Sequence, residues 1–288
     1  MIDKTGYEVT TYRIDGEYED GRHPKSVEFS DRIVDDLCRR DFTINAMAYN
    51  DTDGFVDEFK GLDDLDTKII RCVGEPELRF TEDALRMMRA IRFSAQLGFT
   101  IDEATWNAIK KLSPSISKIS MERVHVELGK TLMSAHPDYV AQYSEAGLFA
   151  PILPVIDNAL KSRYKRKILA TLQHTPDNIY LRYAALFITS TPDEAAKTLR
   201  ALKLDNKTVN TVSKLVELSK MDIEETEPAV RTALNKYGRD FLPLWHELMM
   251  AVIQASEDIT GISNPAKVKH LLTCLLYTSP SPRDRTRS

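Results

Sequence analysis

The sequence predicts an α+β fold, in which a small N-terminal piece of strands, turns and one short helix is followed by an all-helical region. Two observations lead to this prediction. Before about residue 75, short runs of β-branched and aromatic residues alternate with turns that contain glycine. From residue 76 onwards, apolar residues recur at helical spacing between glycine, proline and capping residues. The 288 residues are enough for two or more domains.

The N-terminal piece is expected to contain short strands and one hairpin. Polar residues and glycines make residues 15–26 a loop, and Asp31 is a suitable N-cap for a helix that reaches Cys38. The stretch 50–54, which ends in glycine, separates two strand-like runs and is typical of a hairpin loop. The predicted strands cover residues 7–14, 27–29, 46–49, 55–59 and 68–73.

The helical region is expected to open with three helices, each behind a residue that can cap it. The caps are Thr81, Asp102 and Ser120, and the helices end near residues 97, 112 and 134. Gly98 is a suitable stop for the first of them. Shorter helices separated by prolines are expected to follow, and the sequence contains no internal repeat.

Composition and charge exclude several classes of protein. The net charge of −4 argues against bulk nucleic-acid binding, although basic groups can still gather in one cleft. The three cysteines form no CxxC pair, which argues against a zinc site or a disulfide framework and fits a reducing cytoplasm. No apolar run approaches the roughly 20 residues of a membrane span, and no signal peptide opens the chain.

The segment EDALRMMRAIRF, residues 82–93, combines acids and arginines at helical spacing. On a helix, Asp83 and Arg86 are neighbours, and Arg89 and Arg92 continue the row. One interpretation is a solvated charged face. The other is a nucleobase reader, since a carboxylate accepts from an exocyclic amine and arginine donates to the adjacent ring nitrogen. Such a pair accepts cytosine and adenine and rejects uracil and guanine, and further arginines suit a polyphosphate.

A second constellation, RRDFTINAM, places two arginines, an aspartate and an asparagine among apolar residues 39–47. It can be a helix end with surface charges. It can also be a clamp for phosphate and ribose, with arginine on the phosphates and Asp41 or Asn45 on a hydroxyl or the neighbouring backbone.

Four motifs in order resemble those of class II tRNA nucleotidyltransferases, the family of CCA-adding enzymes and bacterial poly(A) polymerases. Residues 39–49 are similar to its RRDxxxNA motif, and residues 57–65 to DxxxGxxDL. Residues 82–93 are similar to EDxxRxxRxxRF, and residues 119–128 to ISxERIxxEL. The resemblance covers about residues 5 to 150 firmly and the helical remainder only loosely.

The resemblance implies a partial head of the polymerase-β nucleotidyltransferase type, then an all-helical neck, body and tail. The head remainder would be residues 1–74, the neck 75–135 and the tRNA-binding body and tail 136–275. Residues 276–288 break abruptly from the helix before them and look like translated vector sequence, although a basic nucleic-acid-binding tail is an alternative.

The implied reaction is template-independent addition of CMP, CMP and AMP to the 3′ end of tRNA, with CTP and ATP as partners. Asp83 and Arg86 would pair with the incoming base, and Arg40 would contact the nucleotide with support from Asp41. Arg89 and Arg92 would complete the pocket. The segment around Asp57, Gly61 and Asp64 would couple head and neck. Glu122, Arg123 and Glu127 would stabilise the neck.

The family holds two Mg²⁺ ions on a DxD pair that follows a GGxVRD segment, and this combination is not found in the sequence. Its place would precede the first residue, so we expect an incomplete head that exposes a sheet edge and part of its core. Glu8 lies where the third active-site carboxylate would be, although an exposed strand glutamate is the simpler interpretation. Magnesium is therefore expected as the cofactor of the complete enzyme.

Two other functions stay open. A bacterial poly(A) polymerase has nearly the same motifs, and the retained loop 15–26, with Arg22 and His23, argues against an enzyme that adds only C. A non-catalytic RNA-binding helical protein with a degenerate head is the alternative of another class. The basic run 161–167 would grip tRNA phosphates in one interpretation and form a solvated helix face in the other.

We predict that this polypeptide alone does not transfer nucleotides, because it lacks the main carboxylates that would hold the metal ions. The measurement is incorporation of labelled CTP into tRNA lacking CCA. Clear Mg²⁺-dependent incorporation by the 288-residue chain would contradict the prediction.

Overall fold

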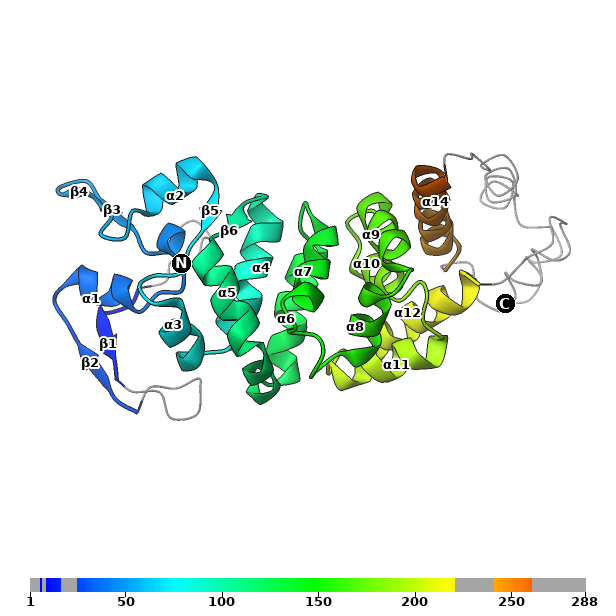
Figure 1. The fold of residues 1–288 in the computed structure, drawn as a ribbon, viewed down its shortest axis with the longest axis horizontal. Coiled ribbons are helices and arrows are strands. Elements are labelled where there is room, and N and C mark those ends of the chain that lie inside the picture. The colour runs from blue at the N-terminus through cyan, green and yellow to red at the C-terminus, as the bar shows by residue number, and fades with distance from the viewer. Residues whose placement is uncertain (1–5, 7–8, 17–24, 221–240, 261–288) are drawn as a thin grey trace, which may run out of the picture. The chain divides into compact units, whose positions relative to one another are not determined.

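A computed structural model describes residues 6, 9–16, 25–220 and 241–260 (Figure 1). The chain divides into two compact units, which are treated separately. The first comprises residues 1–131 with Gln142–Ile152, and the second Leu132–Ala141 with residues 153–288. Short two-stranded sheets occur in the first unit, and helices dominate from α3 onwards. The predicted α+β fold is therefore confirmed.

The first unit begins with two antiparallel ribbons. β1 (Arg13–Asp15) pairs with β2 (Val27–Phe29), and β3 (Ala48–Asn50) pairs with β4 (Gly54–Val56). The predicted hairpin is confirmed because its turn is local: the Asn50 carboxamide accepts from two backbone N–H groups, and Gly54 has a φ of 76°. Of the described part of the predicted strand 7–14, Arg13 and Ile14 are in β1, whereas residues 9–12 are not in a strand.

Helices and one parallel strand pair complete the first unit. β5 (Ile69–Ile70) pairs in parallel with β6 (Thr100–Ile101), a strand that the sequence did not predict. The helices are α1 (Ile33–Cys38), α2 (Gly61–Thr67), α3 (Pro76–Glu82), α4 (Leu85–Leu97), α5 (Glu103–Leu112), α6 (Met121–Leu132) and α7 (Val140–Glu145), with 3-10 turns at Thr43–Asn45 and Ser113–Lys118. The prediction for α5 is confirmed, since the Asp102 side chain accepts from Thr105 N.

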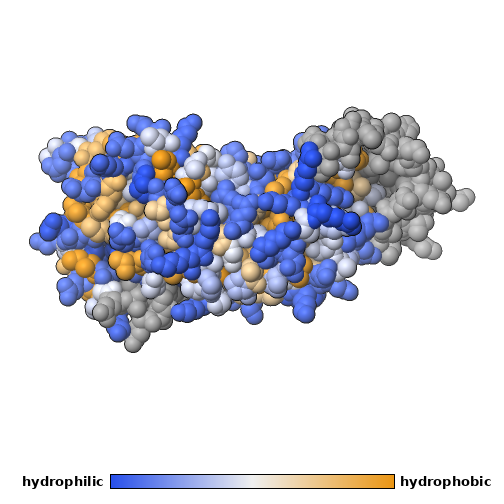
Figure 2. Space-filling model, viewed as in Figure 1, coloured by the Kyte–Doolittle hydropathy of each residue, from blue (hydrophilic) through white to orange (hydrophobic). Residues whose placement is uncertain are grey.

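The core of the first unit lies along the inner face of α4. Met87, Met88, Ala90, Ile91 and Ala95 of this helix are fully buried, and its arginines lie between them in the sequence. A smaller cluster forms around Leu37, Ala46 and Val73. Several apolar side chains of the N-terminal ribbons remain exposed, namely Val27, Phe29, Tyr49 and Phe55, as does Val9 before β1. Figure 2 shows hydrophobic surface over these elements.

The second unit is all-helical within the described residues. It contains a 3-10 turn at Pro137–Tyr139 and helices α8 (Pro154–Lys161), α9 (Lys165–His174), α10 (Ile179–Leu186), α11 (Pro192–Ala201), α12 (Asn206–Leu218) and α14 (Phe241–Thr260). α14 packs against α9, and α11 packs against α12. Two of the prolines expected to separate helices, Pro154 and Pro192, lie at the first turns of α8 and α11, where the missing N–H costs nothing.

Side chains of the motif at residues 57–65 form hydrogen bonds that connect several elements of the first unit. Both Asp57 oxygens accept from the first backbone N–H groups of α2, at Gly61 (2.7 Å) and Leu62 (2.9 Å). The buried Asp64 carboxylate accepts from the Thr43 hydroxyl at 2.7 Å and from Arg71 Nε at 3.1 Å. Arg71 also donates to Asp102, which caps α5, at 2.5 Å.

This chain of contacts joins α2, the strand before α3, and α5. It explains why acids stand at those positions of the motif. It also gives a physical basis for the predicted coupling between head and neck, which itself stays a prediction.

Gly61 packs so closely against its neighbours that any side chain would collide there. An added Cβ would meet the Thr43 carbonyl oxygen and lie 2.7 Å from Met47 Sδ. We predict that Gly61→Ala lowers the free energy of unfolding by about 1–3 kcal/mol through overpacking, measured by urea denaturation. Asp66→Ala, at an exposed position of the same helix, should change it by less than about 0.5 kcal/mol. Equal effects would argue against the steric explanation.

Candidate functional site

The candidate site is organised by a break between two helices. α3 ends at Glu82, and Asp83 has an extended backbone with φ −148° and ψ 105°. The Asp83 carboxylate accepts from Leu85 N at 3.0 Å, and its carbonyl oxygen accepts from Arg86 N at 3.0 Å. Asp83 therefore caps the start of α4. The predicted single helix over residues 82–97 is wrong, because an aspartate can replace the helical hydrogen bond with one from its own side chain.

The Asp83 carboxylate also holds an arginine from α6. Arg123 Nη1 lies 3.2 Å from Oδ1 and Nη2 lies 2.6 Å from Oδ2, a two-pronged ion pair in a largely buried setting. The motif at residues 119–128 and the motif at residues 82–93 are thus joined by the carboxylate of Asp83. The family motif predicts a structural role for Arg123, but the contact between Arg123 and Asp83 joins residues 40 apart and cannot be read from the sequence.

Arg86 has partners other than Asp83. Its Nη1 donates to Glu82 at 2.5 Å and to the Arg79 carbonyl at 3.3 Å. Its Nη2 donates to the Arg39 carbonyl at 2.9 Å. Asp83 and Arg86 are therefore neighbours through the backbone, as predicted from their spacing, but their charged groups are held by separate partners rather than by each other.

Arg89 joins the two constellations that the sequence singled out. Its Nε donates to Asp41 Oδ2 at 2.6 Å. The other Asp41 oxygen accepts from Phe42 N at 3.0 Å and lies 3.4 Å from Asn45 Nδ2. Asp41 is buried, so its charge positions Arg89 while the asparagine fixes the carboxylate. The structure thus brings Asp41 and Arg89 together, which the sequence could not show.

Arg39 and Arg40 share one buried acid. Asp36 accepts from Arg39 Nη2 at 2.5 Å and from Arg40 Nη2 at 3.2 Å. Burial by itself would raise the pKa of the Asp36 carboxyl, but the hydrogen bonds and charges of Arg39 and Arg40 hold that pKa below its ordinary value. The Arg40 side chain is still 42% exposed, so a guanidinium fixed at one edge remains open to a ligand.

Arg92 is built into the core. Its Nε donates to Glu127 at 2.5 Å, and the two side chains are 7% and 5% exposed. A second nitrogen donates to Gln96 at 2.7 Å, and the guanidinium lies over the Phe93 ring, 3.8 Å from its centre. This burial argues for a structural role and against the predicted contact of Arg92 with a polyphosphate.

Two residues that the sequence analysis left without a role complete the site. Glu82 binds Arg86 through one oxygen and Arg79 Nη2 through the other, at 2.6 Å, while Arg79 Nη1 donates to the Cys38 carbonyl. Their three-residue spacing on one helix was a signal for this pair. They border a pocket of about 130 Å³ lined by Ile14, Asp15, Asp35, Cys38, Arg39, Arg79 and Glu82.

Comparisons with known proteins indicate the family. Residues 1–71 match the family described as "Poly A polymerase head domain", and residues 98–160 match "Probable RNA and SrmB- binding site of polymerase A". A CCA-adding enzyme of Streptococcus suis is 36% identical over 279 residues, which are 94% of this chain and 66% of that protein. The CCA-adding enzyme of Ligilactobacillus salivarius is 53% identical over 133 residues, 46% of this chain and 33% of that protein.

A solved structure provides the same result. The Bacillus stearothermophilus CCA-adding enzyme in complex with CTP has a TM-score of 0.67 and 30% identity, covering 93% of this chain and 63% of that one. This chain belongs to the class II CCA-adding enzyme family. The chain spans between one third and two thirds of the length of the relatives named here. The Thermotoga maritima CCA-adding enzyme complexed with tRNA, at 23% identity and a TM-score of 0.55, shares the fold.

Nucleotidyltransferases of the CCA-adding enzyme family use divalent metal ions generally. The described residues contain no group of three or more histidines, cysteines, aspartates and glutamates that could hold one. They therefore do not fit a metal centre. Glu8, the predicted third carboxylate, lies outside the described residues, as do Arg22 and His23. In the part of the chain that the structure describes, no helix is long and apolar enough to cross a membrane.

The Arg92–Glu127 pair allows a direct test of its structural role. We predict that Glu127→Gln lowers the free energy of unfolding by about 3–5 kcal/mol, because it leaves a buried guanidinium without its counter-charge. The measurement is urea denaturation. Replacing both residues, in Arg92→Met with Glu127→Leu, should restore much of the loss.

The matched control is Glu77→Gln, which removes an exposed ion pair with Lys111. That change should cost less than about 1 kcal/mol. A loss at Glu127 no larger than the loss at Glu77 would show that the buried pair has no structural importance.

Proposed function

We propose that this chain is part of a template-independent nucleotidyltransferase that adds CMP and AMP to the 3′ end of tRNA. The observation that carries the proposal is the hydrogen-bonding capacity left on Asp83 and Arg86. Both side chains are fixed by their neighbours, yet neither is saturated. A fixed but unsaturated pair is what recognition of a base edge requires, since it costs little ordering when the base arrives.

Asp83 has room for one more donor. A carboxylate has about four lone-pair positions, and Oδ1 of Asp83 uses both of its own for Leu85 N and Arg123 Nη1. Oδ2 accepts from Arg123 Nη2 alone among the described donors. One acceptor position therefore remains on Oδ2, and the helix cap and Arg123 together fix its direction.

Arg86 has donors to spare. A guanidinium has five N–H groups. Three are accounted for by Glu82 and by the carbonyls of Arg79 and Arg39. The Nε–H and one Nη2–H have no partner among the described residues. Arg86 can thus donate to a ligand without giving up the contacts that position it.

One acceptor on Asp83 together with donors on Arg86 would match cytosine and adenine. Each of these bases has an amine next to an unprotonated ring nitrogen, so both contacts are made. Uracil and guanine have a carbonyl next to an N–H, which would place acceptor against acceptor and donor against donor. A buried mismatch of this kind leaves polar groups unpaired and is costly. The same pair can therefore serve CTP and ATP in turn.

The remaining site residues support this proposal in different degrees. Arg40 is exposed enough to contact the nucleotide, and Asp41 holds Arg89 through an ion pair. Arg92 acts through packing. We propose residues 1–74 as the remainder of the head, 75–135 as the neck and 136–275 as the tRNA-binding body and tail, in a cytoplasmic enzyme. Mg²⁺ with Glu8 as one ligand is a proposal that rests on sequence alone.

A poly(A) polymerase is the second candidate, because the matching head family carries that name. The two candidates differ in nucleotide use. A CCA-adding enzyme must bind both CTP and ATP, whereas poly(A) synthesis needs ATP alone. Comparable affinity of the chain for CTP and ATP would favour CCA addition.

We predict that the chain binds CTP and ATP more tightly than UTP and GTP, and that Asp83→Ala removes this preference. Loss of one hydrogen bond from a charged acceptor should weaken CTP binding by about 1.5–3 kcal/mol, roughly tenfold or more. Isothermal titration calorimetry with the four nucleotides measures both effects. Asp63→Ala, at an exposed position of α2, is the control and should change nothing. Unchanged selectivity in Asp83→Ala would remove the templating role.

A further inference from the structure

Arg79 of α3 is bound by two routes to Arg86, the arginine that is proposed to recognise the base. Its Nη2 forms an ion pair with one Glu82 oxygen at 2.6 Å, and the other Glu82 oxygen accepts from Arg86 Nη1 at 2.5 Å. The backbone carbonyl of Arg79 also accepts from Arg86 Nη1, at 3.3 Å. Arg79 thus contacts Arg86 directly through its carbonyl and indirectly through the Glu82 carboxylate.

The Arg79 guanidinium is itself held at a second point, the C-terminal end of α1. Its Nη1 donates to the Cys38 carbonyl at 3.1 Å, and Arg86 Nη2 donates to the next carbonyl, that of Arg39, at 2.9 Å. The last carbonyls of a helix have no partner within it. Cationic side chains suit this position because the helix dipole places partial negative charge there. The two arginines on either side of the helix break therefore share one anchor.

Two guanidinium groups share the Glu82 carboxylate, and this arrangement has two consequences. The side chains of Arg79, Glu82 and Arg86 are 21%, 20% and 11% exposed, so their ion pairs are partly shielded from water. Because Arg79 occupies one oxygen of the flexible glutamate, the second oxygen stays directed at Arg86. Two positive groups around one negative group also leave positive charge in excess, so Glu82 does not cancel the attraction of Arg86 for a ligand.

We propose that Arg79 is a positioning residue for base recognition, which acts on Arg86 through Glu82. This inference rests on the function proposed above and adds a residue to its specificity. With Arg79 in place, the N–H groups that Arg86 has to spare keep one direction. Without Arg79, the Glu82 side chain is free to turn away from Arg86. Discrimination between cytosine and uracil then weakens, because the donor that meets either ring nitrogen is no longer fixed.

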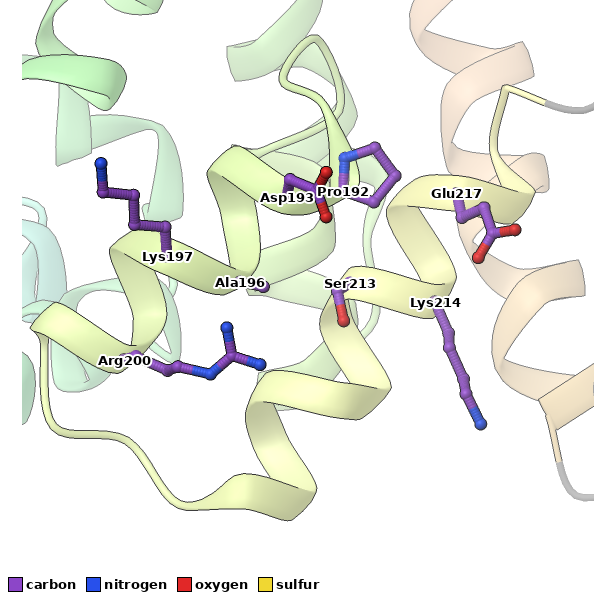
Figure 3. Close-up of a pocket in the computed structure, with 8 residues that line it drawn as sticks. All are labelled: Pro192, Asp193, Ala196, Lys197, Arg200, Ser213, Lys214 and Glu217. Atoms are coloured by element: carbon purple, nitrogen blue, oxygen red, sulfur yellow. The ribbon is translucent and has the colours of Figure 1, made fainter.

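Arg200 of α11 provides a contrasting case in the second unit. Figure 3 shows its guanidinium extending into a groove lined by α11 and α12, and its side chain has no hydrogen bond or ion pair with another described residue. Replacing Arg200 removes one positive charge without breaking an ion pair among the described residues. It is therefore a control for the general effect of charge on the binding of an anionic nucleotide.

The test compares the affinities of the full 288-residue chain for CTP and UTP. Isothermal titration calorimetry measures CTP binding, and displacement of bound CTP measures UTP binding. Arg79→Gln should weaken CTP binding by about three- to tenfold and UTP binding by less, so the preference for CTP falls. Arg79→Lys should keep part of the preference, since an ammonium retains the charge but cannot bridge Glu82 and the Cys38 carbonyl as a planar fork does.

Two control variants and one altered background separate positioning from general effects. Glu77→Gln removes the exposed ion pair with Lys111 from the same helix, and Arg200→Gln removes one charge elsewhere. Neither control should change the preference for CTP. In an Arg86→Gln background, Arg79→Gln should cause no further loss of preference, because the residue on which Arg79 acts is already gone. Circular dichroism confirms that each variant is folded, and Arg79→Lys decides the question if Arg79→Gln does not fold.

The outcomes separate the positioning role from the function that it serves. A loss of preference in Arg79→Gln that is absent from both controls and from the Arg86→Gln background supports the role. Equal weakening of CTP and UTP, or a further loss of preference in that background, would overturn it. If Arg86→Gln removes the preference while both Arg79 variants keep it, the positioning role fails and the proposed function stands. If the unaltered chain shows no preference for CTP, both fail.

Discussion

The candidate site depends on the hydrogen bonds of one carboxylate. Asp83 caps α4 through Leu85 N and binds Arg123 of α6 through both oxygens, so it ends one helix, starts the next and ties in a third. Without that carboxylate, α4 would lose its cap and Arg123 its counter-charge. The same three contacts leave a single acceptor position with a fixed direction. Structural constraint and proposed recognition therefore come from the same atoms.

The arginines of α4 have different roles because their solvent exposure differs, although their spacing along the helix is the same. Arg86, Arg89 and Arg92 follow one another at three-residue intervals, yet their acids come from α3, from the turn after α1 and from α6. Each pairing is set by what packs against that side of α4. Arg92 faces the core and Arg89 is a third exposed, which is why one is structural and the other can still meet a ligand.

Local features of the chain could be predicted from the sequence, and long-range ones could not. The hairpin ending at Gly54 and the cap of α5 follow from neighbouring residues, and four spaced motifs indicated the family. The pairing of β5 with β6 joins residues about 30 apart, and the Thr43–Asp64 hydrogen bond joins residues 21 apart. The break at Asp83 was missed because apolar periodicity continues across it, although an aspartate inside a predicted helix was a signal. Glu8 lies outside the described residues, so its proposed role as a metal ligand rests on the sequence alone.

The most direct test of this account is a double-mutant cycle on CTP affinity with Asp83→Asn, Arg123→Gln and the combined variant. In this proposal Arg123 acts through Asp83, because its two hydrogen bonds fix the direction of the acceptor position that remains free on the Asp83 carboxylate. The account therefore predicts that the combined variant binds CTP no more weakly than Asp83→Asn alone, with a coupling energy of about 1 kcal/mol or more. Strictly additive losses would contradict it, since each residue would then act on the nucleotide without the other.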